Sequence, residues 1–301
     1  MFGADMTYNR NRFMSVKNHY KVSVVIPVYN EGDSLEACLN AIDNLSRKPY
    51  EVIVVDNNST DHTKAVALRH DVRLLNESKQ GVVYARNRGF NAARGNLIAR
   101  IDADSILPAD WLDHVLADFE HDPDVVAISG PADYYDFFSI RRFANWIDRL
   151  CRRYVAGHLG SRLFLYGANM AIKKSAWNKV KAKTCIRHGM HEDLDLAIHL
   201  QEAGLKVAYD EDLVAGISSR RMGNGLRQFI GYAMASPRTY KLHSLSSRRY
   251  MYPIIALVLL LYYPGHLAYL SYDPIAETIS LHYLLAGRMR NSRIDPTVNI
   301  I

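Results

Sequence analysis

The first hundred residues alternate short, β-branched hydrophobic runs with segments whose hydrophobic residues recur at helical spacing, and this alternation constrains the fold most strongly. The runs lie at 22–29, 51–55, 72–75 and 96–101, and a helix is expected at 82–94. Strands that are hydrophobic on both faces are typical of a parallel sheet covered by helices on both sides. The pattern therefore predicts an α/β fold with a mostly parallel sheet flanked by helices.

Polar side chains stand where three of these strands end. Tyr29, Asp56 and Asp102 each lie at the carboxyl end of a predicted strand. Ligands of open parallel sheets bind beyond these strand ends. The three positions are far apart in sequence, yet we expect them to meet at one edge of the sheet and to form a binding site there.

Asp102 and Asp104, one residue apart, follow the run 96–101. Two carboxylates at this spacing can hold one Mg²⁺ or Mn²⁺, because these cations prefer oxygen ligands and keep positions open for phosphate oxygens. A cation held in this way suits a substrate that carries a diphosphate. The alternative is an ordinary loop, since Asp favours turns at strand ends.

A dinucleotide-binding domain would need a Gly-x-Gly-x-x-Gly turn after the first strand. Here residues 27–31 read Pro-Val-Tyr-Asn-Glu, which offers no glycine cradle for a pyrophosphate. In dehydrogenases, glycines and a helix terminus bind the diphosphate of the ligand. We therefore expect a metal to take over this role here.

Six motifs, in order, resemble those of the inverting family 2 glycosyltransferases. They are VVIPVYNE at 24–31, VVDNNSTD at 54–61, ARNRG at 85–89, DAD at 102–104, GANM at 167–170 and ED at 192–193. The resemblance covers about residues 21 to 221. It implies a GT-A fold and a nucleotide-diphosphate sugar as donor, and it leaves the sugar, the acceptor and the linkage open.

The resemblance also implies roles in donor binding. Pro27, Tyr29 and Glu31 would line the nucleoside pocket, and Asp56 would contact the base, usually uracil. Arg86 would lie near the base or the diphosphate. Its guanidinium suits phosphate. The alternative for Arg86 is a position on a solvated helix face, and the alternative for Pro27 and Tyr29 is packing at the end of the strand.

The same resemblance makes Asp104 the direct metal ligand, Asp102 a support for the ribose or the metal, and Asp193 the catalytic base. An acceptor hydroxyl would lose its proton to Asp193 as it attacks the anomeric carbon, while the metal stabilises the departing nucleoside diphosphate. Glu192 and Asp195 are the other candidates for the base, and they could instead orient an acceptor hydroxyl. The alternative for all three acids is capping, because a helix N-terminus favours negative charge.

Four further residues have two interpretations each. His188 and His191 could supply an additional metal ligand, or they could be structural or solvated. Arg220 and Arg221 could close over the diphosphate, or they could be surface charges.

Residues 137–154 combine aromatic and aliphatic residues with arginines at a spacing that predicts an amphipathic helix. The apolar members are Phe137, Phe138, Ile140, Phe143, Trp146, Ile147 and Leu150. Such a helix could pack on the core, or it could contact a membrane or a lipid-linked acceptor.

Residues 251–272 contain no Asp, Glu, Lys or Arg and reach the length of a membrane-crossing helix. Pro264 and Gly265 interrupt the stretch, so a crossing, a re-entrant or interfacial hairpin and a buried core helix all remain open. Basic residues before it (Lys241, Arg248 and Arg249) favour a cytoplasmic face.

Composition narrows the partners and the compartment. The net charge of +6 fits an anionic membrane or a diphosphate substrate, and no nucleic-acid motif accompanies it. The three cysteines show neither paired nor metal-binding spacing, which favours a reducing compartment. The first twenty residues have no hydrophobic core of a secretory signal and read as a tail.

We expect a tail (1–20), a GT-A catalytic domain (21–221) and a C-terminal helical, membrane-associated region (222–301). The catalytic domain would have a nucleotide-sugar half up to about residue 130 and an acceptor half beyond it. The leading hypothesis is an inverting, UDP-sugar-dependent glycosyltransferase on the cytoplasmic face of the cell membrane. It would act in cell-envelope polysaccharide or lipid-linked glycan synthesis.

Two other functions agree with parts of the sequence. A sugar-nucleotide nucleotidyltransferase shares the sheet and the metal carboxylates, but the glycine-rich loop that it usually needs after the first strand is missing here. A non-catalytic glycan-binding scaffold would not need the intact set of Asp102, Asp104 and Asp193.

Overall fold

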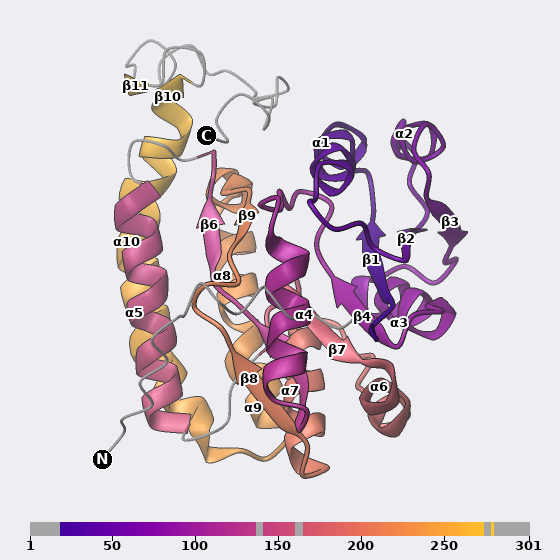
Figure 1. The fold of residues 1–301 in the computed structure, drawn as a ribbon. Coiled ribbons are helices and arrows are strands. Elements are labelled where there is room, and N and C mark those ends of the chain that lie inside the picture. The colour runs from indigo at the N-terminus through magenta and orange to yellow at the C-terminus, as the bar shows by residue number, and fades with distance from the viewer. Residues whose placement is uncertain (1–18, 137–140, 160–164, 274–277, 280–301) are drawn as a thin grey trace.

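The computed structural model describes residues 19–136, 141–159, 165–273 and 278–279, and its centre is a seven-stranded sheet (Figure 1). In spatial order the strands are β3 (Arg73–Asn76), β2 (Glu51–Asp56), β1 (Val22–Val28), β4 (Leu97–Arg100), β7 (Met170–Lys173), β5 (Val125–Ser129) and β8 (Lys206–Tyr209). Only β7 runs antiparallel to its neighbours in this sheet. The predicted mostly parallel α/β architecture is confirmed.

Two short sheets accompany the central one. They pair β6 (Ala132–Tyr134) with β9 (Ala215–Ile217), and β10 (Tyr272–Asp273) with β11 (Thr278–Ile279). The described helices are α1 (Gly32–Asp43), α2 (Thr63–Ala67), α3 (Val82–Ala92), α4 (Trp111–His121), α5 (Arg141–Leu159), α6 (Lys174–Val180), α7 (Glu192–Glu202), α8 (Leu226–Ala233), α9 (Ala235–Leu242) and α10 (Met251–Ser271), with 3₁₀ turns η3 (Arg220–Gly223) and η4 (Ser246–Tyr250).

Helices cover both faces of the sheet because consecutive residues of a strand point to opposite sides. Val24 and Ile26 of β1 pack in the cluster that contains residues of α1 and α4. Val25, between them, packs in the cluster that contains residues of α3, α6 and α7. The two-sided hydrophobic character of the strands thus reflects two separate cores.

The loops at the carboxyl ends of β1 and β2 are joined to each other. Val28 is in register with Asp56, so the two loops start side by side. Asn30 adopts a left-handed φ of 53°, and its Oδ1 accepts the N–H of Thr60 at 2.8 Å. The N–H of Gly32 donates to Asp61. These hydrogen bonds connect the two loops at the edge of the sheet where the sequence predicts the nucleoside site.

The C-terminal helices lie on the side of the molecule away from β3, together with α5 (Figure 1). Among the described residues, one helical stretch, Arg248–Ser271, is long and apolar enough to cross a membrane by length and composition alone. Only 17% of its apolar window is buried. The buried-core interpretation of residues 251–272 is therefore not supported, whereas the choice between crossing and hairpin stays a prediction.

Several expectations concern residues outside the described part of the chain, namely most of the tail at 1–20 and residues Phe137, Phe138 and Ile140. The predicted boundary between residues 221 and 222 falls inside η3, and the division into domains stays a prediction.

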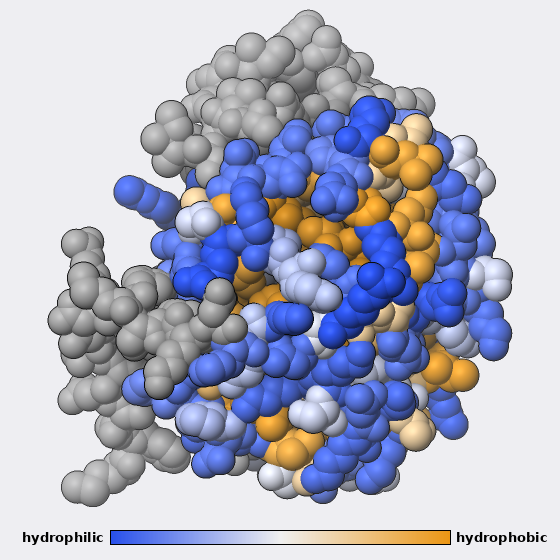
Figure 2. Space-filling view, turned by 45° about the vertical axis from the view of Figure 1, so that its right-hand side comes forward, coloured by the Kyte–Doolittle hydropathy of each residue, from blue (hydrophilic) through white to orange (hydrophobic). Residues whose placement is uncertain are grey.

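One face of the molecule has a recess in which hydrophobic residues are surrounded by hydrophilic ones (Figure 2).

Candidate active site

Asp104 lies in the turn after β4 and is only 8% exposed. Its Oδ2 is 2.9 Å from Nε of Arg220, and the same arginine also pairs with Glu31. Burial raises the pKa of Asp104 to about 6; Arg220 opposes this shift, while Asp102 and Glu31 add to it. Glu31 and Asp104 thus share one guanidinium, and Asp102 is close enough to affect the pKa of Asp104. This oxygen-rich donor set fits a hard divalent cation.

Asp102 forms its ion pair with a different arginine, Arg100 at the end of β4, at 3.0 Å. Nη1 of Arg100 lies 2.7 Å from Oε1 of Glu192 on α7. Arg100 therefore connects the predicted metal turn with the helix that carries the predicted base. Sequence reasoning missed it, although a charged residue inside a hydrophobic strand is a signal that could have found it.

Gly167 lies next to both Arg100 and Asp193. Its N–H donates to Oδ2 of Asp193 at 2.8 Å. A Cβ on Gly167 would lie 1.9 Å from Nη1 of Arg100, so no side chain fits unless the buried guanidinium moves. The GANM motif thus brings a backbone donor to Asp193 while leaving space for Arg100.

We expect Gly167→Ala to lower the free energy of unfolding by about 1–3 kcal/mol, as overpacking of a filled interior does. Denaturant unfolding measures the change. The matched control is Gly231→Ala in α8, where an added Cβ meets nothing within 4 Å. That substitution should be neutral or stabilise by up to about 1 kcal/mol. Equal effects of the two substitutions would contradict the close approach of Arg100.

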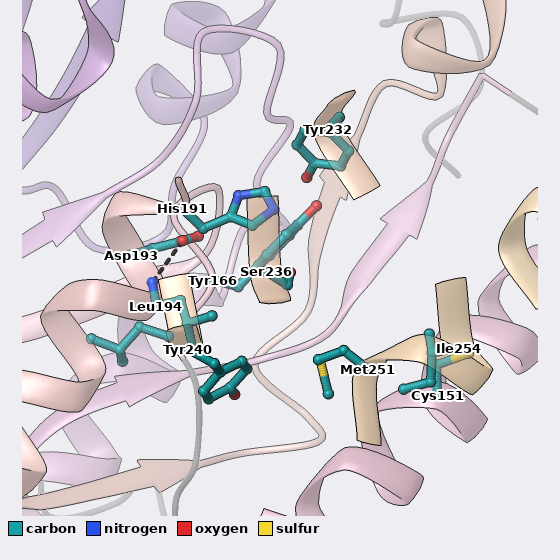
Figure 3. Close-up of a pocket in the computed structure, with 11 residues that line it drawn as sticks. Cys151, Tyr166, His191, Asp193, Leu194, Tyr232, Ser236, Tyr240, Met251 and Ile254 are labelled. Carbon is teal, nitrogen blue, oxygen red and sulfur yellow. Dashed lines mark hydrogen bonds between the residues drawn. The ribbon is translucent and has the colours of Figure 1, made fainter. Parts of the chain in front are cut away.

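Asp193 lies in the first turn of α7, where its Oδ1 also accepts the N–H of Leu194 at 2.8 Å. It lines a pocket of about 210 Å³ (Figure 3). The other lining residues are Cys151, Leu165, Tyr166, His191, Leu194, Tyr232, Ser236, Tyr240, Met251 and Ile254. His191, Tyr166 and Tyr232 are near Asp193, whereas Met251, Ile254 and Cys151 form the apolar part farther away. The pocket thus offers a carboxylate beside polar groups and an apolar extension.

The other two acids of this helix turn do not line that pocket. Burial alone would raise the pKa of the Glu192 carboxyl. The guanidinium groups of Arg100 and Arg86 outweigh this effect and lower the pKa below its usual value. Asp195 is fully buried on another side of α7, where His243 contacts it at 2.8 Å. Among the three acids, Asp193 is the one placed to accept a proton from a molecule in the pocket.

Arg86 is 1% exposed, and its Nη1 donates to the carbonyl oxygen of Glu192 at 3.2 Å. The guanidinium lies over the rings of Phe90 and Trp177, 5.7 and 5.4 Å from their centroids. Burial lowers its pKa to about 10. The side chain is therefore no solvated helix face. Its contact with the base or diphosphate stays a prediction, and in this structure it supports the start of α7.

The predicted nucleoside residues lie along the carboxyl edge of β1 and β2. Tyr29 is exposed and Pro27 is half-buried. Asp56 is 1% exposed, and its Oδ1 accepts the N–H of Ser59 at 3.3 Å while Oδ2 lies 3.4 Å from Nζ of Lys64. Glu31 is held by Arg220. Their roles toward a nucleotide stay predictions.

The structure shows where the four residues with two interpretations lie, namely Arg220, Arg221, His188 and His191. Arg220 lies between Glu31 and Asp104, and Arg221 lies 4.1 Å from the ring centroid of Tyr232, so both flank the site. His191 lines the pocket edge-to-face with Tyr232, and His188 is exposed. Neither histidine belongs to a group of potential metal ligands within the described residues.

Sequence reasoning missed most of the residues that line the pocket. Tyr166 directly precedes the GANM motif, while Tyr232, Ser236 and Tyr240 come from α8 and α9, where no motif marks them. Only the proximity of these segments in the fold identifies them.

Comparison with known proteins identifies the family of this chain. Residues 23–181 match the sequence model of the family described as "Glycosyl transferase family 2". Glycosyltransferase AglE of Haloferax volcanii is 25% identical over 276 residues, which cover 84% of each chain.

Solved structures show the same fold. The mannosyltransferase PcManGT from Pyrobaculum calidifontis, in complex with GDP-Man and Mn²⁺, gives a TM-score of 0.58 at 21% identity over 90% of this chain and 80% of that one. Glucosyl-3-phosphoglycerate synthase from Mycobacterium tuberculosis, in complex with Mn²⁺, UDP-Glc and phosphoglyceric acid, gives 0.52 at 19% identity over 74% and 82%.

Proposed function

Because the chain belongs to glycosyl transferase family 2, we propose that it transfers a sugar, with inversion, from a nucleotide-diphosphate sugar to an acceptor hydroxyl in the pocket at Asp193. The observation that carries this proposal is the chain of contacts from Asp102 through Arg100 to Glu192, next to Asp193. It connects the predicted donor acids with the predicted base. A direct displacement needs both in one site.

Asp104, with Asp102 and Glu31 near it, would hold a divalent cation, Mg²⁺ or Mn²⁺, which when bound neutralises charge on the departing diphosphate. Arg220 occupies the space between Glu31 and Asp104 here, so we propose that it turns toward the phosphates when the donor binds. Asp193 keeps its carboxylate oriented through the N–H groups of Gly167 and Leu194 and accepts the hydroxyl proton.

The nucleoside would lie against Tyr29, Pro27 and Asp56, with UDP as the proposed nucleotide. The two similar structures were solved with different donors, GDP-Man and UDP-Glc. Release of nucleoside diphosphate from a panel of nucleotide sugars, with Mn²⁺ or Mg²⁺ present, tests the proposal. We expect slow, metal-dependent release from one or a few donors. Formation of pyrophosphate from a nucleoside triphosphate and a sugar phosphate, or no turnover of any donor, would contradict it.

We further propose that the acceptor is lipid-linked and that the protein acts at the cytoplasmic face of a membrane. The pocket connects Asp193 with apolar residues of α5 and α10, namely Cys151, Met251 and Ile254. Phe143 and Trp146 of α5 are exposed, and α10 exposes Leu260, Tyr263 and Leu267. These surfaces would enter the interface of an anionic bilayer and support a role in cell-envelope polysaccharide or lipid-linked glycan synthesis.

We expect the protein to float with anionic phospholipid vesicles in a density gradient. The double substitution Phe143→Ala and Trp146→Ala should weaken vesicle binding at least about tenfold, since burial of apolar area contributes about 25 cal/mol per Å². Tyr50→Ala, at an exposed aromatic residue near β1, is the matched control and should bind like the wild type. A wild-type chain that stays in the soluble fraction would contradict membrane association, and unchanged binding of the double variant would contradict the role of α5.

A further inference from the structure

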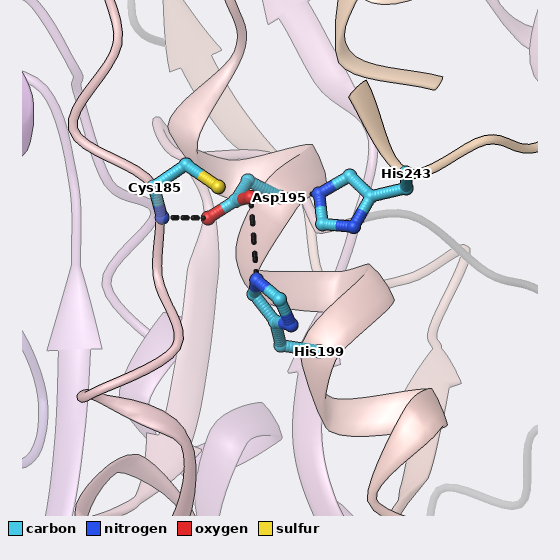
Figure 4. Close-up of side chains that lie close together, drawn as sticks. All are labelled: Cys185, Asp195, His199 and His243. Carbon is cyan, nitrogen blue, oxygen red and sulfur yellow. Dashed lines mark hydrogen bonds and ion pairs between the residues drawn. The ribbon is translucent and has the colours of Figure 1, made fainter. Parts of the chain in front are cut away.

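A second group of potential metal ligands lies beside α7, separate from the pocket that Asp193 lines (Figure 4). It consists of Cys185, Asp195, His199 and His243, whose ligand atoms all lie within 4.8 Å of one another. Asp195 and His199 are four positions apart on α7, Cys185 comes from the loop before this helix, and His243 directly follows α9. Three separate segments therefore bring sulfur, nitrogen and oxygen donors to one point.

The two imidazole rings are oriented in the same way. Nε2 of His243 lies 2.8 Å and Nε2 of His199 lies 3.5 Å from Oδ1 of Asp195. Their Nδ1 atoms face Glu202, at 3.1 Å for His199 and 3.9 Å for His243. Metal-bound histidines commonly donate their second ring N–H to a carboxylate, which fixes the tautomer. Glu202 is placed to accept this hydrogen bond from His199 and lies on the Nδ1 side of His243, so that both Nε2 atoms face Asp195.

Hydrogen bonding inside the protein leaves the centre incompletely satisfied. Nε2 of His199 is buried and makes no hydrogen bond, and the residue is 8% exposed. Asp195 is fully buried, and its Oδ2 accepts the N–H of Cys185 at 2.9 Å, which places the thiol beside the carboxylate. A buried polar atom without a partner is costly. A bound ion would give this nitrogen its partner.

We propose that Cys185, Asp195, His199 and His243 bind one structural Zn²⁺. The set of one sulfur, two imidazole nitrogens and one carboxylate oxygen suits tetrahedral zinc. On binding, a Zn–S bond forms and the Cys185 thiol gives its proton to solvent, while both histidines stay neutral. The charges of the thiolate and the carboxylate then balance the ion, which removes the cost of burying an unpaired charge.

The alternative is an ion pair between Asp195 and protonated histidines without a metal. That arrangement leaves Nε2 of His199 at 3.5 Å from Asp195, without a hydrogen bond. The proposed ion would join α7 to the end of α9, and Asp193 lies only two positions before Asp195. The zinc site would therefore position the helix that carries the predicted base. It is separate from Asp104, whose partner is Arg220.

Metal analysis of the full chain, purified with Zn²⁺ present and desalted in a weak chelator, tests the proposal. We expect about one zinc ion per chain in the wild type, as a closed four-ligand site retains its metal. The variants Cys185→Ser and His243→Gln should lose most of it. The exposed His188→Gln is the matched control, and Asp104→Asn removes the donor acid; both should retain the wild-type zinc content. This separates the site from the proposed catalytic metal.

Cobalt replacement provides a readout that does not depend on activity. In the Co²⁺-loaded protein we expect a thiolate-to-cobalt charge-transfer band, which Cys185→Ser should abolish. Wild-type protein that retains no zinc, or equal zinc content in the wild type and in both cluster variants, would overturn the proposal. Cobalt spectra without a thiolate band in the wild type would also overturn it.

Discussion

Replacing Asp193 by asparagine is expected to lower kcat for sugar transfer about 10²- to 10⁴-fold, the range that general base catalysis contributes. Donor affinity should remain within about twofold, because Asp193 lines the acceptor pocket and the donor acids lie elsewhere. An asparagine can keep only one of the two backbone hydrogen bonds, from Gly167 or Leu194, with its single carbonyl oxygen. The substitution therefore removes the proton acceptor with little change in side-chain size.

Steady-state kinetics with the donor identified by the release assay, together with calorimetric donor binding, measure both quantities. Asp71→Asn, at an exposed acid before β3, is the control for the loss of one charge and should leave kcat unchanged. Wild-type turnover of Asp193→Asn would exclude Asp193 as the base. His191 would then be the next candidate, because it lines the same pocket while Glu192 and Asp195 do not.

Asp104→Asn is expected to abolish the metal dependence of donor binding and to weaken donor affinity in the presence of Mn²⁺ at least about 100-fold, since a metal contributes several kcal/mol at a phosphoryl oxygen. The substitution also takes away the carboxylate that pairs with Arg220, which lies 2.9 Å from it. Calorimetric titration with the nucleoside diphosphate, with and without Mn²⁺, measures the effect.

Asp110→Asn, at an exposed acid farther along the same segment, is the matched control. The raised pKa of Asp104, about 6, adds a second check on the wild type. Metal must displace the proton from a protonated carboxyl, so apparent Mn²⁺ affinity should fall as the pH is lowered through about 6. Metal-dependent donor binding by Asp104→Asn at wild-type affinity would refute the role of this acid.

Much of the donor half could be predicted from the sequence because its signals are local. The strands predicted at 51–55 and 72–75 are Glu51–Asp56 and Arg73–Asn76 in the structure. Period and turn chemistry determine such elements over a few neighbouring residues. The predicted helix at 82–94 ends at Ala92, and the amphipathic helix extends to Leu159, beyond the expected end at 154. Element ends depend on packing partners, which the local pattern does not contain.

The electrostatic connections of the site could not be predicted, because each joins residues distant in the chain. Arg220 pairs with Glu31 across 189 positions, and Arg100 binds Glu192 on a helix of the other half. No periodicity or motif records such a pairing. The zinc proposal shows the same limit: no sequence pattern marked His199 or His243, whereas His188 and His191 were the histidines suggested as possible ligands.

The most direct test of the central claim, that a cation at Asp104 binds the donor diphosphate, is anomalous scattering from crystals grown with Mn²⁺ and the donor identified by the release assay. We predict a manganese peak between the Asp104 carboxylate and the diphosphate oxygens, with Arg220 no longer paired to Asp104. A diphosphate bound without manganese would contradict the claim. So would a manganese peak found only at the group of Cys185, Asp195, His199 and His243 while Arg220 still contacts Asp104.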